Sequence, residues 1–181
     1  MRLKILVLLT FVMIGFACES NEDSIDNSNQ TITSADLLGT WNLTKQTMEE
    51  GSSTVTSDGE TYIASFSSLA KNINYTFTFA ENPNKINFQG TYTLVTSTSI
   101  MGQNMVEEKE IDTSIDLIEP LGWSLINNSL TIVENVELPE GMIIEEFTSN
   151  SIKLKGQIEE TYIEDDELVA LKATMYIELE R

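Results

Sequence analysis

Apolar and polar residues alternate along most of the chain after residue 34, as in strands that turn one face to a core and the other to solvent. The clearest run is 168–180, where every second side chain is apolar. Residues 73–79 and 86–94 show the same period, and the segment 81–85 between them carries a proline flanked by two asparagines. Turn residues of this kind between two alternating runs predict a β-hairpin.

Shorter or weaker alternation predicts further strands. They are expected at residues 41–48, 100–106, 110–118, 123–126, 130–136, 142–148 and 152–158. Residues 60–71 are ambiguous, and the pattern there allows a short helix. Together these runs predict an all-β antiparallel meander. Closure into an up-and-down β-barrel of about eight to nine strands would remove both sheet edges, and a β-sandwich is the alternative.

The first 17 residues have a different pattern, a basic start followed by a mostly apolar run from Ile5 to Ala17. This run is too short for a helix that crosses a hydrocarbon core of about 30 Å, and it fits the apolar region of a signal peptide. We therefore interpret residues 1–17 as a signal peptide, 18–33 as a tether and 34–181 as one domain.

Cys18, the one cysteine in the sequence, follows the apolar run directly. A cysteine in this position resembles the lipidation site of bacterial lipoproteins, although Gly15 and Phe16 stand where that motif usually has leucine and a small residue. A free thiol would be reactive in an oxidising compartment, which favours lipidation. The resemblance implies a lipid anchor at the outer membrane of the cell envelope. Ordinary signal cleavage before Cys18, giving a secreted protein, is the alternative.

The tether is polar and acidic, with few apolar side chains, and we expect it to be disordered. As a flexible coil it would hold the domain roughly 20–25 Å from the membrane. Its residues 20–23, Ser-Asn-Glu-Asp, resemble the export signal of Bacteroidota surface lipoproteins, which implies exposure at the cell surface. A solvated linker that happens to be acidic is the alternative.

Charge and composition exclude several classes of function. The chain has 10 basic and 29 acidic residues, and without Arg2 and Lys4 of the signal peptide the net charge is 8 − 29 = −21. This charge repels nucleic acid and anionic lipid headgroups, and it favours a monomer. The sequence has no histidine, which removes histidine-based catalysis and the usual zinc and copper sites. We expect no enzymatic activity, no bound metal and no cofactor.

Residues Gly39-Thr40-Trp41, at the start of the first expected strand, resemble the opening of the lipocalin-like domains found in Bacteroidota-type lipoproteins. Residues 74–94 and 122–132 also resemble those domains, so the likeness covers most of the chain after residue 35. It implies an up-and-down barrel that binds a small apolar ligand.

The resemblance also implies structural roles at one end of the barrel. Gly39 lets the chain turn into the first strand, and Trp41 closes that end, with Trp123 as a second core tryptophan. In lipocalins an arginine on the last strand packs over the first tryptophan. The late arginine of this chain is Arg181, and nothing in the sequence shows that it reaches Trp41.

A barrel of about eight strands holds either packed side chains or one small ligand. Inward tyrosine hydroxyls could orient such a ligand. The candidates are Tyr62, Tyr75, Tyr92 and Tyr162. The alternative is that these hydroxyls lie at the rim. Methionines such as 101, 105, 142 and 175 could line an adaptable cavity or fill gaps in the core.

Acidic residues crowd two expected hairpins, at 107–112 and 159–167. Carboxylates on a turn could begin a calcium site, but a solvated charge run that protects a sheet edge is the better explanation. We therefore predict a lipid-anchored envelope protein whose barrel binds a small apolar ligand. A protein-interaction module with a filled core is the alternative, and a cavity above about 300 Å³ would favour ligand binding.

Overall fold

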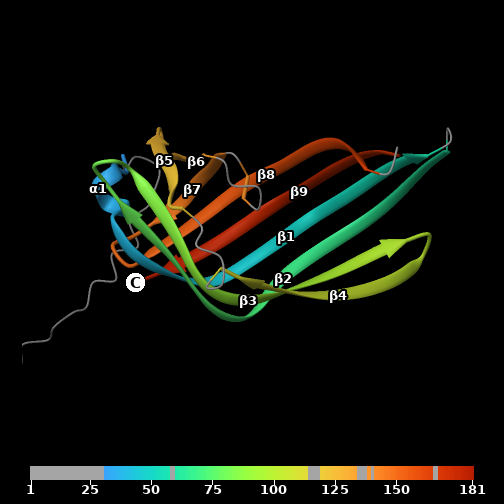
Figure 1. Ribbon diagram of the computed structural model, residues 1–181, viewed down its shortest axis with the longest axis horizontal. Helices are drawn as coiled ribbons and strands as arrows, with labels where there is room; N and C mark the ends of the chain where they lie inside the picture. Colours follow the sequence, from blue (N-terminus) through green and yellow to red (C-terminus); the bar gives the residue numbers. More distant parts are fainter. Residues whose placement is uncertain (1–30, 58–59, 114–118, 134–137, 140, 165–166) are drawn as a thin grey trace, which may run out of the picture.

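The computed structural model describes residues 31–57, 60–113, 119–133, 138–139, 141–164 and 167–181. Within these ranges one short helix precedes nine strands (Figure 1). They are α1 (Ser34–Leu37), β1 (Gly39–Ser57), β2 (Glu60–Ala80), β3 (Lys85–Ile100), β4 (Gln103–Asp112), β5 (Leu121–Ile126), β6 (Ser129–Ile132), β7 (Gly141–Phe147), β8 (Ser151–Glu164) and β9 (Glu167–Glu180). None of the described helical residues forms a segment long and apolar enough to cross a membrane.

The strands form one antiparallel sheet that closes into a ring. Their order is β2-β1-β9-β8-β7-β6-β5-β3-β4, and an additional pairing between β2 and β3 completes the circle. The first strand therefore pairs with the last, β1 with β9, over most of its length. The predicted all-β fold and its closure into a barrel are confirmed, and the sheet does not split into a sandwich.

Several strands are longer than predicted. Residues 60–71 form no helix and belong to β2, which continues to Ala80. Likewise β3 runs past Leu94 to Ile100, and β4 starts only at Gln103. The added segments are rich in serine and threonine, so they lack the alternation of apolar and polar residues that marks a strand in the sequence. They form strands because their backbones pair with neighbouring strands. The expected strand tail at 114–118 lies outside the described residues.

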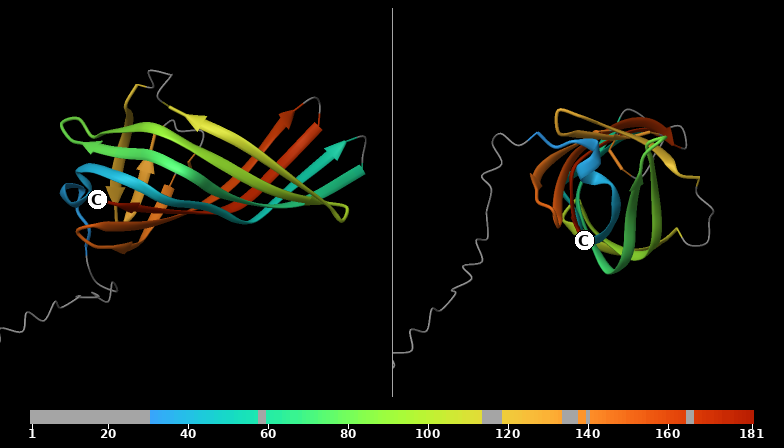
Figure 2. Two further views of the ribbon diagram at one scale, coloured as in Figure 1. Left: turned by 90° about the horizontal axis from the view of Figure 1, so that it is seen from below. Right: turned by 90° about the vertical axis from the view of Figure 1, so that its left-hand side faces the viewer.

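The barrel is fully closed over only part of its length. The hairpins β1–β2, β3–β4 and β8–β9 extend in one direction beyond the short strands β5, β6 and β7, which lie near α1 (Figures 1 and 2). In the described residues β4 pairs only with β3, and residues 157–164 of β8 pair only with β9. Two sheet edges therefore face an opening that the short strands do not reach.

Aromatic side chains fill the closed end. The ring centres of Phe77 and Phe88 lie 4.9 Å apart, and those of Phe79 and Trp123 lie 5.3 Å apart, both edge to face. Such pairs contribute about 0.5–1.5 kcal/mol each beyond their burial. The Trp123 Nε1–H donates to the carbonyl oxygens of Ala80 and Lys85, each at 3.1 Å, and so holds the β2–β3 turn. Trp123 is buried in the core.

Candidate ligand pocket

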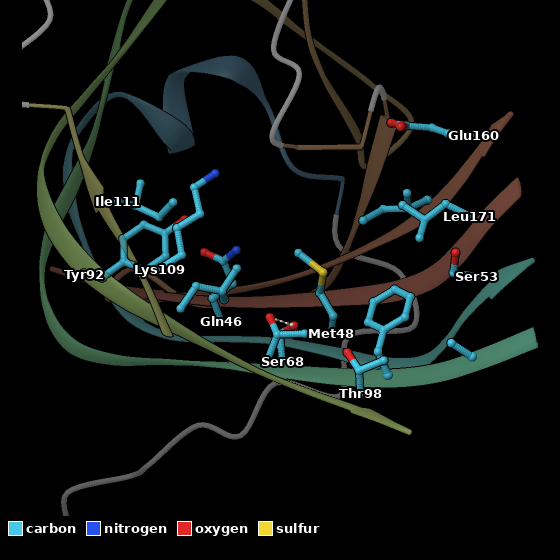
Figure 3. A pocket seen from close by; sticks show the side chains of 15 residues that line it. Gln46, Met48, Ser53, Ser68, Tyr92, Thr98, Lys109, Ile111, Glu160 and Leu171 are labelled. Atoms are coloured by element: carbon cyan, nitrogen blue, oxygen red, sulfur yellow. Dashed lines mark hydrogen bonds between the residues drawn. The ribbon is translucent and has the colours of Figure 1, made fainter. Parts of the chain in front are cut away.

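A pocket of about 500 Å³ occupies the open half of the barrel. Its walls are the inner faces of β1, β2, β3, β4, β8 and β9 (Figure 3). Side chains alternate across each strand, so those that point inward recur at every second residue, as at 64, 66 and 68 of β2. The closed aromatic end forms the base of this half, and the hairpin tips form its far end.

The lining is mainly apolar. Its larger apolar side chains are Met48, Phe66, Leu94, Ile111, Ile158 and Leu171. These residues come from six strands. Ile111 also belongs to the buried core of the closed end, and Met48, Leu94 and Ile158 pack against that core. An apolar wall from several rigid strands suits a small apolar ligand.

A few polar groups interrupt the apolar wall. The Ser68 and Thr96 hydroxyls lie 2.8 Å apart and satisfy each other across β2 and β3. The Gln46 side chain also lines the pocket, and its residue is only 4% exposed. Among the described residues, no side-chain or backbone group forms a hydrogen bond with the Gln46 amide. A ligand or water in the pocket could therefore satisfy that amide.

One lining side chain of each charge borders the opening. Lys109 comes from β4 and Glu160 from β8, the two strands with unpaired edges. Figure 3 shows Lys109 near Tyr92 and Ile111, with Glu160 on the other side of the pocket. No carboxylate of the described residues pairs with Lys109; the ion pairs there join Lys45–Glu178, Lys153–Glu146, Lys155–Glu145 and Lys172–Glu159.

Of the four predicted tyrosines, only Tyr92 lines the pocket. Tyr75 is buried directly behind it, with the two rings edge to face and their centres 5.1 Å apart. Tyr62 lies outside the pocket and donates a hydrogen bond to Glu60 Oε2 at 2.6 Å, which raises the pKa of the Tyr62 hydroxyl above its ordinary value. Tyr162 is 42% exposed and also lies outside the pocket.

The methionines divide between core and surface. Met142 and Met175 are fully buried, whereas Met101 and Met105 are exposed on the β3–β4 hairpin. The pocket methionine is Met48, which the sequence did not single out. Its segment of β1 continues through Glu49 and Glu50, where a bulge interrupts the alternation of inward and outward residues.

The closed end is sealed around Trp41, which is fully buried. Its Nε1–H donates to the Leu37 carbonyl oxygen at 2.7 Å, so α1 packs across the end of the barrel. Arg181 does reach this tryptophan, because its guanidinium carbon lies 3.8 Å from the centre of the ring. Gly39 starts β1 with a φ of +107°, a conformation that glycine adopts readily.

The acidic hairpins do not assemble a metal site among the described residues. No group of three or more acidic, histidine or cysteine side chains comes together there in a way that could hold a metal ion. Glu159 instead pairs with Lys172 across β8 and β9 at 3.2 Å. Cys18 and most of the tether lie outside the described residues.

Comparison of the chain with family models, with curated proteins and with solved structures finds no match in any of the three.

Proposed function

We propose that this chain is a lipoprotein of the cell envelope, anchored at the outer membrane through Cys18, whose lipocalin-like barrel binds a small, largely apolar ligand. The observation that carries the proposal is the pocket of about 500 Å³ on the inner face of the open half-barrel. Pockets for small molecules are typically about 300–1,000 Å³, with apolar walls and a few polar groups. The Trp41–Arg181 contact is the one that the lipocalin resemblance implies, and it also supports the proposal.

The arrangement of the two ends agrees with an N-terminal anchor. The chain enters the domain at Thr33 and α1, at the closed end of the barrel. The hairpin tips and the opening lie at the other end (Figure 1). A tether attached at the closed end leaves the pocket free to exchange its ligand.

A pocket-filling substitution tests ligand binding. Ala64 lines the pocket, and Ala64→Phe would place a ring in the space that the ligand needs. Ala170 of β9 comes directly before the lining residue Leu171, so its side chain points to the outer face of the sheet. Ala170→Phe is therefore a matched change outside the pocket. Binding of the neutral dye N-phenylnaphthylamine is measured by fluorescence titration of the purified chain.

We expect Ala64→Phe to weaken dye binding at least about fivefold, equivalent to roughly 1 kcal/mol, and Ala170→Phe to leave it unchanged. Both variants must melt within a few degrees of the wild-type chain for the comparison to count. Absence of dye binding by the wild-type chain, or equal binding by Ala64→Phe, would refute the ligand-binding proposal.

A second function is favoured by the tips of the long hairpins, which expose apolar side chains. They are Ile63, Met101, Met105, Val106, Ile163 and Leu168. Exposed apolar groups gathered at one end of a molecule mark contact sites for other proteins. The proposal is a protein-interaction module that uses these tips, in addition to or in place of ligand binding.

Cross-linking in the native envelope tests this second function. Replacement of Met101, Met105 and Val106 by serine should abolish any specific cross-linked partner and leave dye binding intact. Ile126→Ser is the control, since Ile126 is equally exposed but lies on β5, away from the tips. A partner that is retained by the triple variant would refute the role of the β3–β4 tip.

A further inference from the structure

Lys109 is the one basic side chain among the described residues of the pocket wall. The β3–β4 register places it opposite Leu94, which also lines the pocket and pairs in turn with Ala70 of β2. Its sequence neighbours Glu108 and Glu110 are on the opposite face of β4 and do not line the pocket. Lys109 is exposed at the opening, and its ammonium group has three donors and no acceptor, so a ligand group that pairs with it must be an anion or another acceptor.

Gln46 provides a second polar group on the same wall. In the view of Figure 3 its amide lies on the same side of the pocket as Lys109 and Tyr92, and Leu171 and Glu160 lie on the other. The residue is 96% buried, and its amide has no hydrogen-bond partner in the part of the chain that is described. Among the described residues, the fully buried side-chain atom without a partner is Thr47 Oγ1, so the Gln46 amide is reached from the pocket, where a ligand acceptor can replace water as its partner.

The larger side chains in the rest of the wall are mainly apolar, among smaller hydroxyl residues, and this combination sets the shape of the ligand. Met48, Phe66 and Leu171 lie beyond Gln46 toward the hairpin tips, and Figure 3 places Leu171 well away from Lys109. A ligand that satisfies both regions needs a polar group at one end and an apolar body. Such a molecule is an amphiphile.

The sign of the charge on the polar group follows from Lys109. Glu160 carries the opposite charge, but it lies on the other side of the pocket, away from Gln46. The net negative charge of the chain repels anions at long range, yet salt screens exposed charges beyond about 8 Å. Lys109 is itself exposed at the opening, so its attraction for an anion depends on direct contact at short range, where salt screens the interaction less than it screens the distant acidic residues.

We infer that the pocket binds an amphiphile with an anionic headgroup, which pairs with the Lys109 ammonium and accepts a hydrogen bond from the Gln46 amide. Its apolar body then lies against Phe66, Leu94 and Leu171. This inference rests on the proposed ligand-binding function and specifies the chemical class of the ligand.

Three probes that share one alkyl chain and differ in headgroup test the inference. They are dodecanoate, dodecanol and dodecylamine, each measured by displacement of N-phenylnaphthylamine below its micelle concentration. The variants are Lys109→Gln, Lys109→Arg and, as the matched charge control, Lys71→Gln. Lys71 is exposed on β2 and does not line the pocket.

We expect the wild-type chain to prefer dodecanoate to dodecanol, and Lys109→Gln to weaken dodecanoate about three- to tenfold while leaving dodecanol unchanged. Lys109→Arg should retain most of the preference, and Lys71→Gln all of it. A hydrogen-bond contribution from Gln46 predicts that Gln46→Leu also weakens dodecanoate.

The opposite results are equally clear. Preference for dodecylamine, equal binding of the acid and the alcohol, or parallel loss of both in Lys109→Gln would overturn the inference. In each of these cases dye binding by the wild-type chain still supports the proposed ligand-binding function. Failure of the dye and all three probes to bind would instead refute that function itself.

Discussion

Arg181 covers Trp41 and at the same time holds the short helix that crosses the barrel end. Its Nη2 donates to the carbonyl oxygens of Asp36 and Leu38, each at 2.9 Å, while its guanidinium carbon lies 3.8 Å from the tryptophan ring centre. The backbone N–H of Arg181 also donates to the Asn150 carbonyl oxygen, which ties it to the start of β8. One side chain therefore links α1, β1 and β9 at the closed end.

Replacement of Arg181 by alanine should lower the free energy of unfolding by about 2 kcal/mol, because it removes a cation–π contact and two hydrogen bonds from a charged donor. The check is urea unfolding followed by tryptophan fluorescence, which also reports on Trp41. The control is Lys153→Ala, which removes only an exposed ion pair with Glu146 and should cost much less than Arg181→Ala. Equal losses in the two variants would contradict the role assigned to Arg181.

Asp36 should contribute to stability in a pH-dependent way. Its carboxylate accepts hydrogen bonds from the Thr33 backbone N–H and hydroxyl at 2.8 and 2.6 Å, and these bonds hold the pKa of Asp36 below its ordinary value. A carboxyl with a lowered pKa in the folded state stabilises the fold above the pKa of the unfolded state, and this contribution is lost as the pH falls.

Asp36→Asn should therefore cost about 0.5–1 kcal/mol at pH 7, and the difference from the wild-type chain should shrink as the pH falls below about 4. Denaturant unfolding at several pH values measures this difference. A constant difference over that range would show that the charge of Asp36 is not what stabilises the helix start.

Gly90 lies on β3 where the backbone of β2 approaches closely. Its φ is +119°, and an added Cβ would lie 1.9 Å from the Asn74 carbonyl oxygen. Gly90→Ala should cost more than about 2 kcal/mol through strain and a shifted backbone, as judged by the loss of thermal stability. Gly122→Ala is the control, since its Cβ would meet only Val133 atoms at 3.7 Å and should cost less than about 0.5 kcal/mol.

Cys18→Ser tests the proposed anchor. The variant should move from the membrane to the soluble fraction, and it should lose metabolic labelling with palmitate, because the thiol that would carry the lipid is gone. The matched control is Ser20→Ala, which leaves that thiol in place and should stay in the membrane fraction. Retention of both membrane association and label in Cys18→Ser would refute lipidation at this residue.

The sequence was informative where one face of a strand is apolar and the other polar. Residues 73–79, 86–94 and 168–180 alternate because their inner faces pack into the core, and each of them lies in a strand. Closure of the ring could be inferred because a long meander needs to bury its edges. These features follow from local patterns and needed no knowledge of long-range contacts.

The pocket could not be located in the same way. Its β2 and β3 walls include Ser68, Thr96 and Thr98, and polar residues on both faces of a strand leave no alternation to detect. Lys109 lies within the acidic run 107–112 and is exposed, so the sequence does not distinguish it from its solvated neighbours; the β3–β4 register places it opposite the lining residue Leu94. Similarly, only the three-dimensional pairing of β1 with β9 brings Arg181 to Trp41.

Partial closure of the barrel separates most of the residues that maintain the fold from most of those that line the pocket. The same long strands pass through both halves, but the aromatic cluster lies at one end and the pocket at the other. Substitutions at lining residues outside the core, such as Ser53, Ala64 and Thr98, therefore leave the packing of Phe77, Phe88 and Trp123 intact. Such a chain can change its ligand specificity during evolution, or in a designed library, without having to rebuild its core.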